Sequence, residues 1–264
     1  MKTFIQKSAT MLAAFGVLCL LLVLPSGLLA QQTAQEWLVT IDRNLNPDHY
    51  ESYRKLINVE PDGSKKEFVL FTVKQGKDKT AALFLSPASE NGRSTLRVGD
   101  NMWLYIPNVG RPIRITSLQS VTGGIFNNSD ILRVDYQTEY DAVSIKVLDQ
   151  PSDSGDNLLQ LDLKAKTGSV AYDRLEMEID PKTKQPVKIR ALTVSGMLIK
   201  TLYFKKITDF GNGIKRPAVV ETDSPLYKGY QSIMIFAGIK PRKLSPEVFT
   251  TDYMGRIESL RQKQ

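Results

Sequence analysis

The sequence of 264 residues contains only one cysteine and one histidine. Two such residues cannot assemble a Cys/His zinc site, an iron–sulfur cluster or an intramolecular disulfide bond. We therefore expect no metal site, and we expect a large hydrophobic core to provide the stability that disulfides give to many exported proteins.

Catalytic signatures are also missing. The sequence has no Gly-x-Ser-x-Gly motif, no phosphate-binding loop and no dinucleotide fingerprint. The single histidine, His49, follows Asn46-Pro47-Asp48 and is expected in a loop, and Glu176 and Glu178 lie on the polar face of an alternating segment. We predict a protein that is not an enzyme and has no cofactor, with an exported hydrolase as a further alternative.

The composition is that of a globular protein, with 42% apolar and 24% charged residues. Lysine and arginine number 35 against 28 aspartates and glutamates, which gives a net charge of +7. This surplus is spread along the chain and forms no run, so nucleic-acid binding is not expected. Attraction to anionic lipid surfaces or acidic partners is more natural.

The first thirty residues have the pattern of a secretory signal peptide. Lys2 and Lys7 precede an unbroken apolar run over residues 11–24, and a proline and a glycine follow before Ala30. The run is short for a membrane span, which needs about 20 residues. We predict a signal peptide over residues 1–30, cleavage near Ala30 and a location outside the cytoplasm.

Two alternatives concern this N-terminal segment. It could remain as an uncleaved anchor, because Leu28 stands where cleavage sites prefer a small side chain. Cys19 could be lipidated, although Leu18 occupies the position where a lipobox requires a small residue. Cleavage after Ala30 would remove two lysines and the cysteine and lower the net charge to +5.

The remaining chain, residues 31–264, is expected to form a single domain that is mainly antiparallel β. Thr33 and Glu36 form a capping box at the start of an amphipathic helix over residues 33–45. The period then changes to two, with polar turns between short segments. We predict about ten to eleven strands in an antiparallel meander, at residues 50–59, 66–74, 80–85, 95–98, 102–106, 159–165, 175–180, 187–195, 198–208, 214–222 and 227–238, and a helical tail from about Thr251 to Gln264. A meander of this length closes or curls and so creates a concave apolar face.

Residues 97–141 depart from simple alternation. Trp103 and Tyr105 share one face of a strand whose other face is also apolar, so either face could be plain core or the wall of a cavity. Residues 117–128 have apolar side chains at helical spacing around Gly123-Gly124, as in a short hinged lid helix or an irregular loop.

Arg111 and Arg114 follow a turn in the same region. They could pair with the carboxylates of the returning segment, Asp130, Asp135, Glu139 and Asp141. Such pairs would form a solvated surface network. Alternatively, Arg111, Arg114 and Asp130 could latch a lid or hold an anionic head group.

The run from Gly99 to Pro107, followed by Arg111, Arg114 and Gly123-Gly124-Ile125-Phe126-Asn127-Asn128-Ser129-Asp130, resembles the LolA-like outer-membrane lipoprotein-sorting proteins. The resemblance implies a periplasmic protein with a curved, unclosed β-barrel and a helical lid over an apolar cavity. It also implies an acylated cargo, with an inner-membrane ABC exporter as donor and an outer-membrane acceptor. The longer central loop of this sequence leaves the cargo open.

The residues and the resemblance together give two functional hypotheses. The first is a monomeric periplasmic carrier or chaperone that shuttles lipoproteins or another lipid toward the outer membrane. The second is a lipid-sensing module of the envelope-stress response with the same cavity. For either, the expected ligand-binding residues are Phe71, Trp103, Tyr105, Leu118, Phe126, Leu161 and Met177.

Overall fold

The central element of the fold is one large antiparallel sheet. The structure, a computed structural model, describes residues 32–120, 122–133 and 135–261, so the predicted signal peptide over residues 1–30 lies outside the described residues. Within these ranges the sheet has thirteen strands. The residues from Gln32 onward form a compact unit.

The first strands along the chain are β1 (His49–Val59), β2 (Lys65–Gln75), β3 (Lys79–Ser86), β4 (Ser94–Val98), β5 (Asn101–Tyr105) and β6 (Ile113–Ile115). The others are β7 (Tyr140–Pro151), β8 (Asn157–Ala165), β9 (Arg174–Asp180), β10 (Gln185–Leu192), β11 (Leu198–Asp209), β12 (Lys215–Asp223) and β13 (Gln231–Pro241). Two meanders, β1 to β6 and β7 to β13, meet where β1 pairs with β13.

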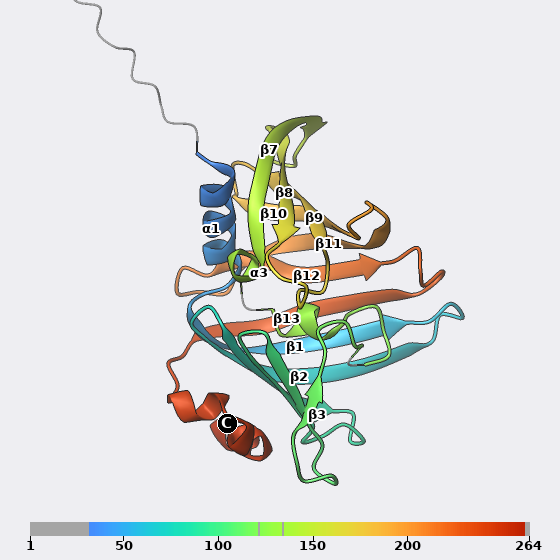
Figure 1. Ribbon diagram of the computed structural model, residues 1–264, viewed down its shortest axis with the longest axis vertical. Helices are drawn as coiled ribbons and strands as arrows, with labels where there is room; N and C mark the ends of the chain where they lie inside the picture. The colour runs from blue at the N-terminus through green and yellow to red at the C-terminus, as the bar shows by residue number, and fades with distance from the viewer. Residues whose placement is uncertain (1–31, 121, 134, 262–264) are drawn as a thin grey trace, which may run out of the picture. The chain divides into compact units, whose positions relative to one another are not determined.

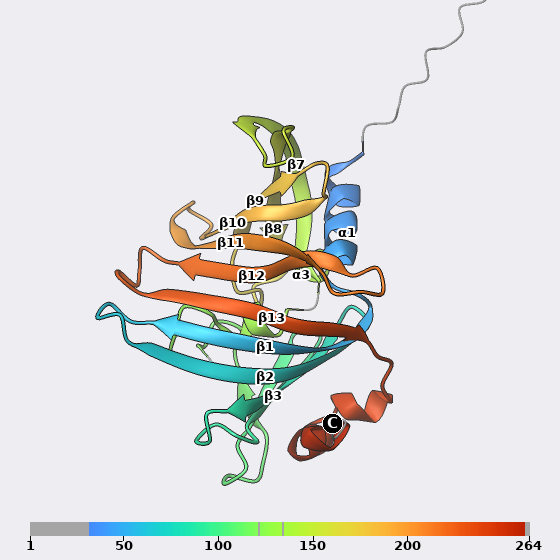
Figure 2. The same ribbon diagram turned by 180° about the vertical axis from the view of Figure 1, so that it is seen from behind.

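The sheet is curved and does not close (Figure 1). Its two edge strands, β6 and β7, are consecutive in the sequence, and residues 116–139 connect them. The view from behind shows β9 to β13, β1 and β2 side by side (Figure 2). The prediction of a mainly antiparallel, unclosed barrel is therefore confirmed.

The predicted number of strands was too low, because β6 and β7 were missed. β6 has only three residues, which is too short for a visible alternation. β7 is an edge strand that is largely exposed, including Val143 and Val147, so its apolar residues do not follow a buried face. The sequences of both strands show little alternation of apolar and polar residues, and both strands form by pairing with a neighbouring strand.

The predicted N-terminal helix and its capping box are confirmed. α1 (Ala34–Leu45) begins after Thr33, whose side chain accepts a hydrogen bond from the Glu36 amide, and Glu36 bonds back to the Thr33 amide. Leu38, Ile41 and Leu45 are buried on one face. This face packs against β7, β10 and β12 and against the short helix α3 (Tyr136–Glu139), which lies beside α1 in Figure 1.

Alternate side chains of the strands contribute to two hydrophobic clusters. The interior cluster lies inside the curve and draws on both meanders, α1 and the connection 116–139; it includes Leu70, Met102, Phe126, Leu161, Met177 and Phe236. The outer cluster includes Phe71, Val73, Leu83, Leu96, Val248, Phe249, Met254 and Ile257. In β2, Leu70 belongs to the interior cluster and its neighbour Phe71 to the outer one, as expected for a strand covered on both faces.

The C-terminal residues cover the outer cluster. Two 3-10 helices, η1 (Pro246–Phe249) and η2 (Thr251–Leu260), pack against β3 and β4, and η2 also contacts β5. A helical tail was predicted from about Thr251, and the observed helix is of the tighter 3-10 type.

Of the two alternatives expected for residues 117–128, a hinged lid helix or an irregular loop, the described residues form the irregular loop. The described residues there are turns and bends closed by an isolated bridge between Ser120 and Asn127, and the helix α2 (Asn128–Ile131) starts only afterwards. The reason lies in the Gly123-Gly124 pair: Gly123 has a φ of 76°, which is incompatible with a right-handed helix. Along the described part of the chain, no helix has the length and apolar character of a membrane span.

Candidate functional site

The connection between the edge strands occupies the inside of the curved sheet. We call residues 116–139 the interior segment. Phe126, Ile131, Leu132 and Tyr136 of this segment are buried in the interior cluster. The segment therefore fills the concave side with residues of the chain itself.

Hydrogen bonds from the central strands hold the first part of the interior segment. The side-chain amide of Asn58 on β1 donates to the carbonyl oxygen of Thr122 at 3.0 Å. The hydroxyl of Ser232 on β13 accepts a hydrogen bond from the backbone amide of Ile125 at 3.0 Å. Ser232 in turn donates to Asn58. Gly124 lies so close to Asn58 that a Cβ atom would stand 2.0 Å from its Oδ1 atom, so only glycine fits there.

Buried ion pairs hold the second part of the segment. Each joins a strand cation to a carboxylate of the segment: Lys200 to Asp130 at 2.7 Å, Arg97 to Glu139 at 2.7 Å and Lys74 to Asp135 at 3.1 Å. Arg133 adds a pair with Glu139 at 2.5 Å within the segment. Charges removed from water carry a large desolvation cost, so such pairs fix a geometry more than they add stability.

Asp130 is the most highly connected carboxylate in this network. Besides Lys200, it accepts hydrogen bonds from the Tyr172 hydroxyl at 3.1 Å and from the backbone amide of Asn127. Burial, followed by the Asp130 charge, raises the pKa of Tyr172 well above its usual value, so this phenol stays a hydrogen-bond donor.

Asp42 attaches α1 to the same segment. Its carboxylate accepts hydrogen bonds from the amides of Tyr136 and Gln137, at 2.9 and 2.8 Å, at the start of α3. Burial and the charge of Asp135 raise the pKa of Asp42 to about 7. The two amide hydrogen bonds act in the opposite direction and favour the ionised carboxylate.

A small cavity remains between the interior segment and the sheet. Its volume is about 60 Å³, which is room for a few water molecules. Most of its walls are apolar, and four charged side chains complete it; its lining residues are Leu45, Asn46, Arg54, Phe126, Asp130, Arg133, Tyr136, Leu202, Phe204, Arg216, Val220, Met234 and Phe236. Pockets that bind small molecules measure about 300–1,000 Å³, so an acyl chain fits here only if the segment moves.

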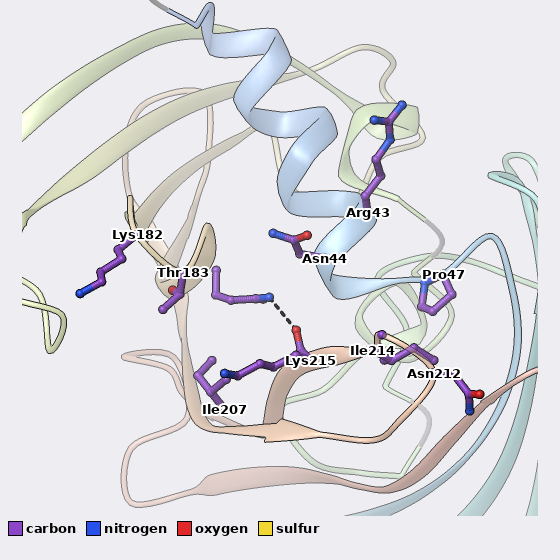
Figure 3. Close-up of a pocket in the computed structure, with 11 residues that line it drawn as sticks. Arg43, Asn44, Pro47, Lys182, Thr183, Ile207, Asn212, Ile214 and Lys215 are labelled. Atoms are coloured by element: carbon purple, nitrogen blue, oxygen red, sulfur yellow. Dashed lines mark hydrogen bonds between the residues drawn. The ribbon is translucent and has the colours of Figure 1, made fainter.

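Larger hollows lie on the surface and are more polar. One groove of about 530 Å³ runs between the end of α1 and the turns after β9 and β11, with Arg43, Lys182 and Lys215 among its lining residues (Figure 3). Two of the lining residues are joined by a hydrogen bond of 2.9 Å from the Gln185 side chain to the Lys215 carbonyl. A groove with this lining suits water and polar groups better than hydrocarbon, so its volume alone does not make it the site.

The structure separates the seven residues that the sequence suggested for ligand binding. Phe126, Leu161 and Met177 come together in the interior cluster. Phe71, Trp103 and Tyr105 belong to the outer cluster under η2, on the other face of the sheet. Leu118 is 60% exposed in a turn. Of the two faces of the Trp103 strand, the one with Met102 is the one that looks into the interior.

The arginines expected to form a latch do not reach their expected partners. Arg111 is exposed in the turn before β6, and Arg114 donates to Asn101 and lies 5.1 Å from the ring centre of Trp103. The four carboxylates proposed for them pair elsewhere, and Asp141 binds Lys166. Asp130, Asp135 and Glu139 each pair with a buried cation of another strand.

The cations that do hold the segment were missed at the sequence level. Arg54, Lys74, Arg97 and Lys200 come from four different strands and are buried. The available signal was a cation on the dry face of an alternating strand: in β1, Arg54 follows Tyr50 and Ser52 on the buried face. Among the described residues, no group of histidine, cysteine and acidic side chains has the arrangement of a metal site.

Comparisons with known proteins support the fold. A family model with the description "uncharacterized protein" matches residues 76–256. The LolA superfamily protein NE2245 from Nitrosomonas europaea is 26% identical, with a TM-score of 0.75 over 84% of this chain and 99% of that one.

Two further solved structures share the fold. A domain from Vibrio parahaemolyticus named for outer-membrane lipoprotein sorting is 15% identical and has a TM-score of 0.69, over 84% of this chain and all of that one. A DUF1329 family protein from Desulfovibrio piger is 20% identical with a TM-score of 0.71, over 84% and 97% of the two chains. No curated protein sequence matched the chain.

Proposed function

Because this chain belongs to the LolA-like proteins, in the family whose model covers residues 76–256, we propose that it is a periplasmic carrier of acylated cargo. In this proposal the acyl chains of a lipoprotein or another lipid bind inside the curved sheet. An inner-membrane exporter of the ABC type supplies the cargo, and an outer-membrane acceptor receives it.

One observation carries the proposal: the apolar concave face of an unclosed sheet is covered by a connecting segment and not by a further strand. The interior segment pairs with the sheet through side chains of Arg54, Asn58 and Lys200 and contributes no strand to the ladder. Moving it away therefore breaks few backbone hydrogen bonds. The face that it would uncover includes Leu161, Met177 and Phe236.

The energetics favour such a design. Each methylene exposed to water costs about 0.8 kcal/mol, so a chain of about 16 carbons represents on the order of 10 kcal/mol. The interior cluster offers an equivalent apolar surface once the segment is displaced. The ion pairs between the interior segment and the sheet add little to the free-energy cost of displacing the segment. Buried ion pairs contribute little net stability, and water can solvate the charges once they separate.

Carriage by this route needs no catalytic group. The cargo moves to the acceptor when the acceptor binds it more tightly, so transfer depends on a difference between two affinities. Three buried cations, Lys74, Arg97 and Lys200, are engaged in ion pairs that hold the segment. This role is consistent with the lack of a catalytic signature in the sequence.

The test is native mass spectrometry of the protein isolated from its own cell envelope, combined with displacement of a fluorescent fatty acid from the purified protein. We expect a bound species whose mass matches a lipid or an acylated peptide, and a fluorescent probe that is protected from water. A protein that repeatedly carries no such species and does not protect the probe would contradict the carrier.

A pair of variants locates the binding site. Leu202→Phe adds volume at the wall of the small interior cavity and is expected to weaken probe binding. Val194→Phe adds the same ring at a position that is 75% exposed and serves as the control. If both variants bind the fluorescent probe with the affinity of the wild-type protein, the probe does not bind inside the curved sheet.

A further inference from the structure

Two buried arginines meet at one aromatic ring inside the curved sheet. Arg54 on β1 lies directly opposite Phe236 on β13, and its guanidinium carbon is 4.8 Å from the ring centre. The guanidinium carbon of Arg216 on β12 is 4.0 Å from the same centre. Both side chains line the 60 Å³ cavity under the interior segment.

The hydrogen-bond partners of these two arginines are all neutral. Arg54 donates to the Ile131 carbonyl at 2.8 Å, to the Tyr50 hydroxyl at 3.1 Å and to the Ser52 hydroxyl. Arg216 donates to the carbonyl of Leu45 and to the side chain of Asn46. Among the described residues, no carboxylate lies within ion-pair distance of either guanidinium.

The other buried cations of the interior differ in this respect. Lys74, Arg97 and Lys200 each have a carboxylate partner on the interior segment. Among the buried cations that the structure describes in the interior, Arg54 and Arg216 are thus the two without a carboxylate partner. Burial, and then the nearby Arg54, lowers the pKa of Arg216 to about 10, with only Tyr50 and Tyr136 opposing.

A buried charge without a partner of opposite sign lowers the stability of a protein. The residues that line the cavity suit an anionic group that would neutralise this charge. Three arginines and one aspartate line it, and Asp130 is already occupied by Lys200 and Tyr172. The remaining wall is apolar, with Leu202, Val220 and Met234. A guanidinium beside such a wall suits an anionic group that is attached to a hydrocarbon chain.

We infer that Arg54 and Arg216 bind the anionic head group, a carboxylate or a phosphate, of the lipid cargo, while its hydrocarbon chain lies on the interior cluster. This inference rests on the proposed carrier function and adds the charge of the cargo. Arg54 donates a hydrogen bond to the Ile131 carbonyl of the interior segment. A head group that takes the place of this carbonyl releases the segment and so couples binding to opening.

The experiment compares ligands that differ only in the head group. Dodecanoate, dodecyl phosphate and dodecanol compete at pH 8 for the fluorescent fatty-acid probe on the full-length protein. Charge-assisted hydrogen bonds favour the two anions by about tenfold or more over the alcohol. Inorganic phosphate without a chain is expected to compete poorly.

The same comparison on variants assigns the residues. Arg54→Met and Arg216→Met are expected to bring the affinity ratio of dodecanoate to dodecanol close to one, whereas Arg54→Lys and Arg216→Lys keep part of the preference. Arg190→Met, which removes a partly exposed cation paired with Glu176, leaves the ratio unchanged. A ratio measured within one variant does not depend on how much of that variant is folded.

The outcomes separate the two proposals. If dodecanol binds as tightly as dodecanoate, the head-group site is refuted and the carrier stands. If no amphiphile displaces the probe, the carrier itself is refuted. If inorganic phosphate competes as well as dodecyl phosphate, the arginines bind a free anion and the assignment to a lipid head group is wrong.

Discussion

Lys200 and Asp130 form an ion pair of 2.7 Å inside the curved sheet, although seventy residues separate them in the sequence. The ammonium group of Lys200 also donates to the carbonyl of Ile125 at 2.6 Å. One strand side chain thus fixes two points of the interior segment. This places the segment over the apolar face on which the proposed function depends.

Removal of Lys200 is expected to destabilise the protein strongly. Lys200→Met leaves Asp130 buried with weaker compensation, and breaking a buried pair in this way costs about 3–5 kcal/mol. Lys205, on the same strand, pairs with Glu221 at the same distance of 2.7 Å but is half exposed, so Lys205→Met should cost less than about 1 kcal/mol. Urea unfolding of both variants measures the difference, and equal losses would refute the role assigned to burial.

Gly124→Ala is expected to detach the first part of the interior segment. The added Cβ atom would overlap the Asn58 side chain, whose hydrogen bonds to Thr122 and Ser232 must then rearrange. Overpacking of this kind costs about 1–3 kcal/mol, and hydrogen exchange of the amides in residues 122–131 should accelerate.

Gly168→Ala provides the matched control. A Cβ atom at Gly168 meets no other atom within contact distance, and its backbone lies outside the left-handed region. This variant should keep the wild-type stability and exchange pattern. Slow exchange of residues 122–131 in Gly124→Ala would show that the glycine is not needed for close packing on β1.

The free energy of unfolding is expected to fall as pH rises through the titration of Asp42, because burial and the charge of Asp135 disfavour its ionised form. The pKa of Asp42 is about 7 in the folded protein against 3.8 for the unfolded group, so the folded state binds more protons between these values. The contribution of Asp42 to stability is therefore complete below about pH 4 and declines up to about pH 7. Asp42→Asn removes this decline. The melting temperature of the wild-type protein, measured relative to that of the variant, should therefore fall between about pH 4 and pH 7. A difference in melting temperature that stays constant over this range would contradict the shifted pKa.

Trp103→Ala is expected to reduce stability without affecting lipid binding. The partly buried ring packs in the outer cluster, and the Arg114 guanidinium lies over its face. Its loss should lower the free energy of unfolding by about 1–3 kcal/mol. The fluorescent fatty-acid probe should bind the folded variant with wild-type affinity. A loss of probe binding by folded Trp103→Ala would place the ligand on the outer face of the sheet.

The sequence by itself determined the local structure of this protein. The capping box of Thr33 and Glu36 set the start of α1, and the alternation in segments such as residues 159–165 set eleven of the thirteen strands. These features depend on residues close in the chain, and their physical signals are the period of the apolar residues and the hydrogen bonds of the cap.

The tertiary structure decided which face is interior and how the charges pair. Trp103 and Met102 are both apolar, and only the curvature of the sheet and the position of η2 assign them to opposite clusters. The partner of Asp130 is Lys200 and not Arg111 or Arg114, because pairing of the two meanders at β1 and β13 brings a distant strand beneath the segment. Ion pairs follow proximity in space, which an alternating pattern does not encode.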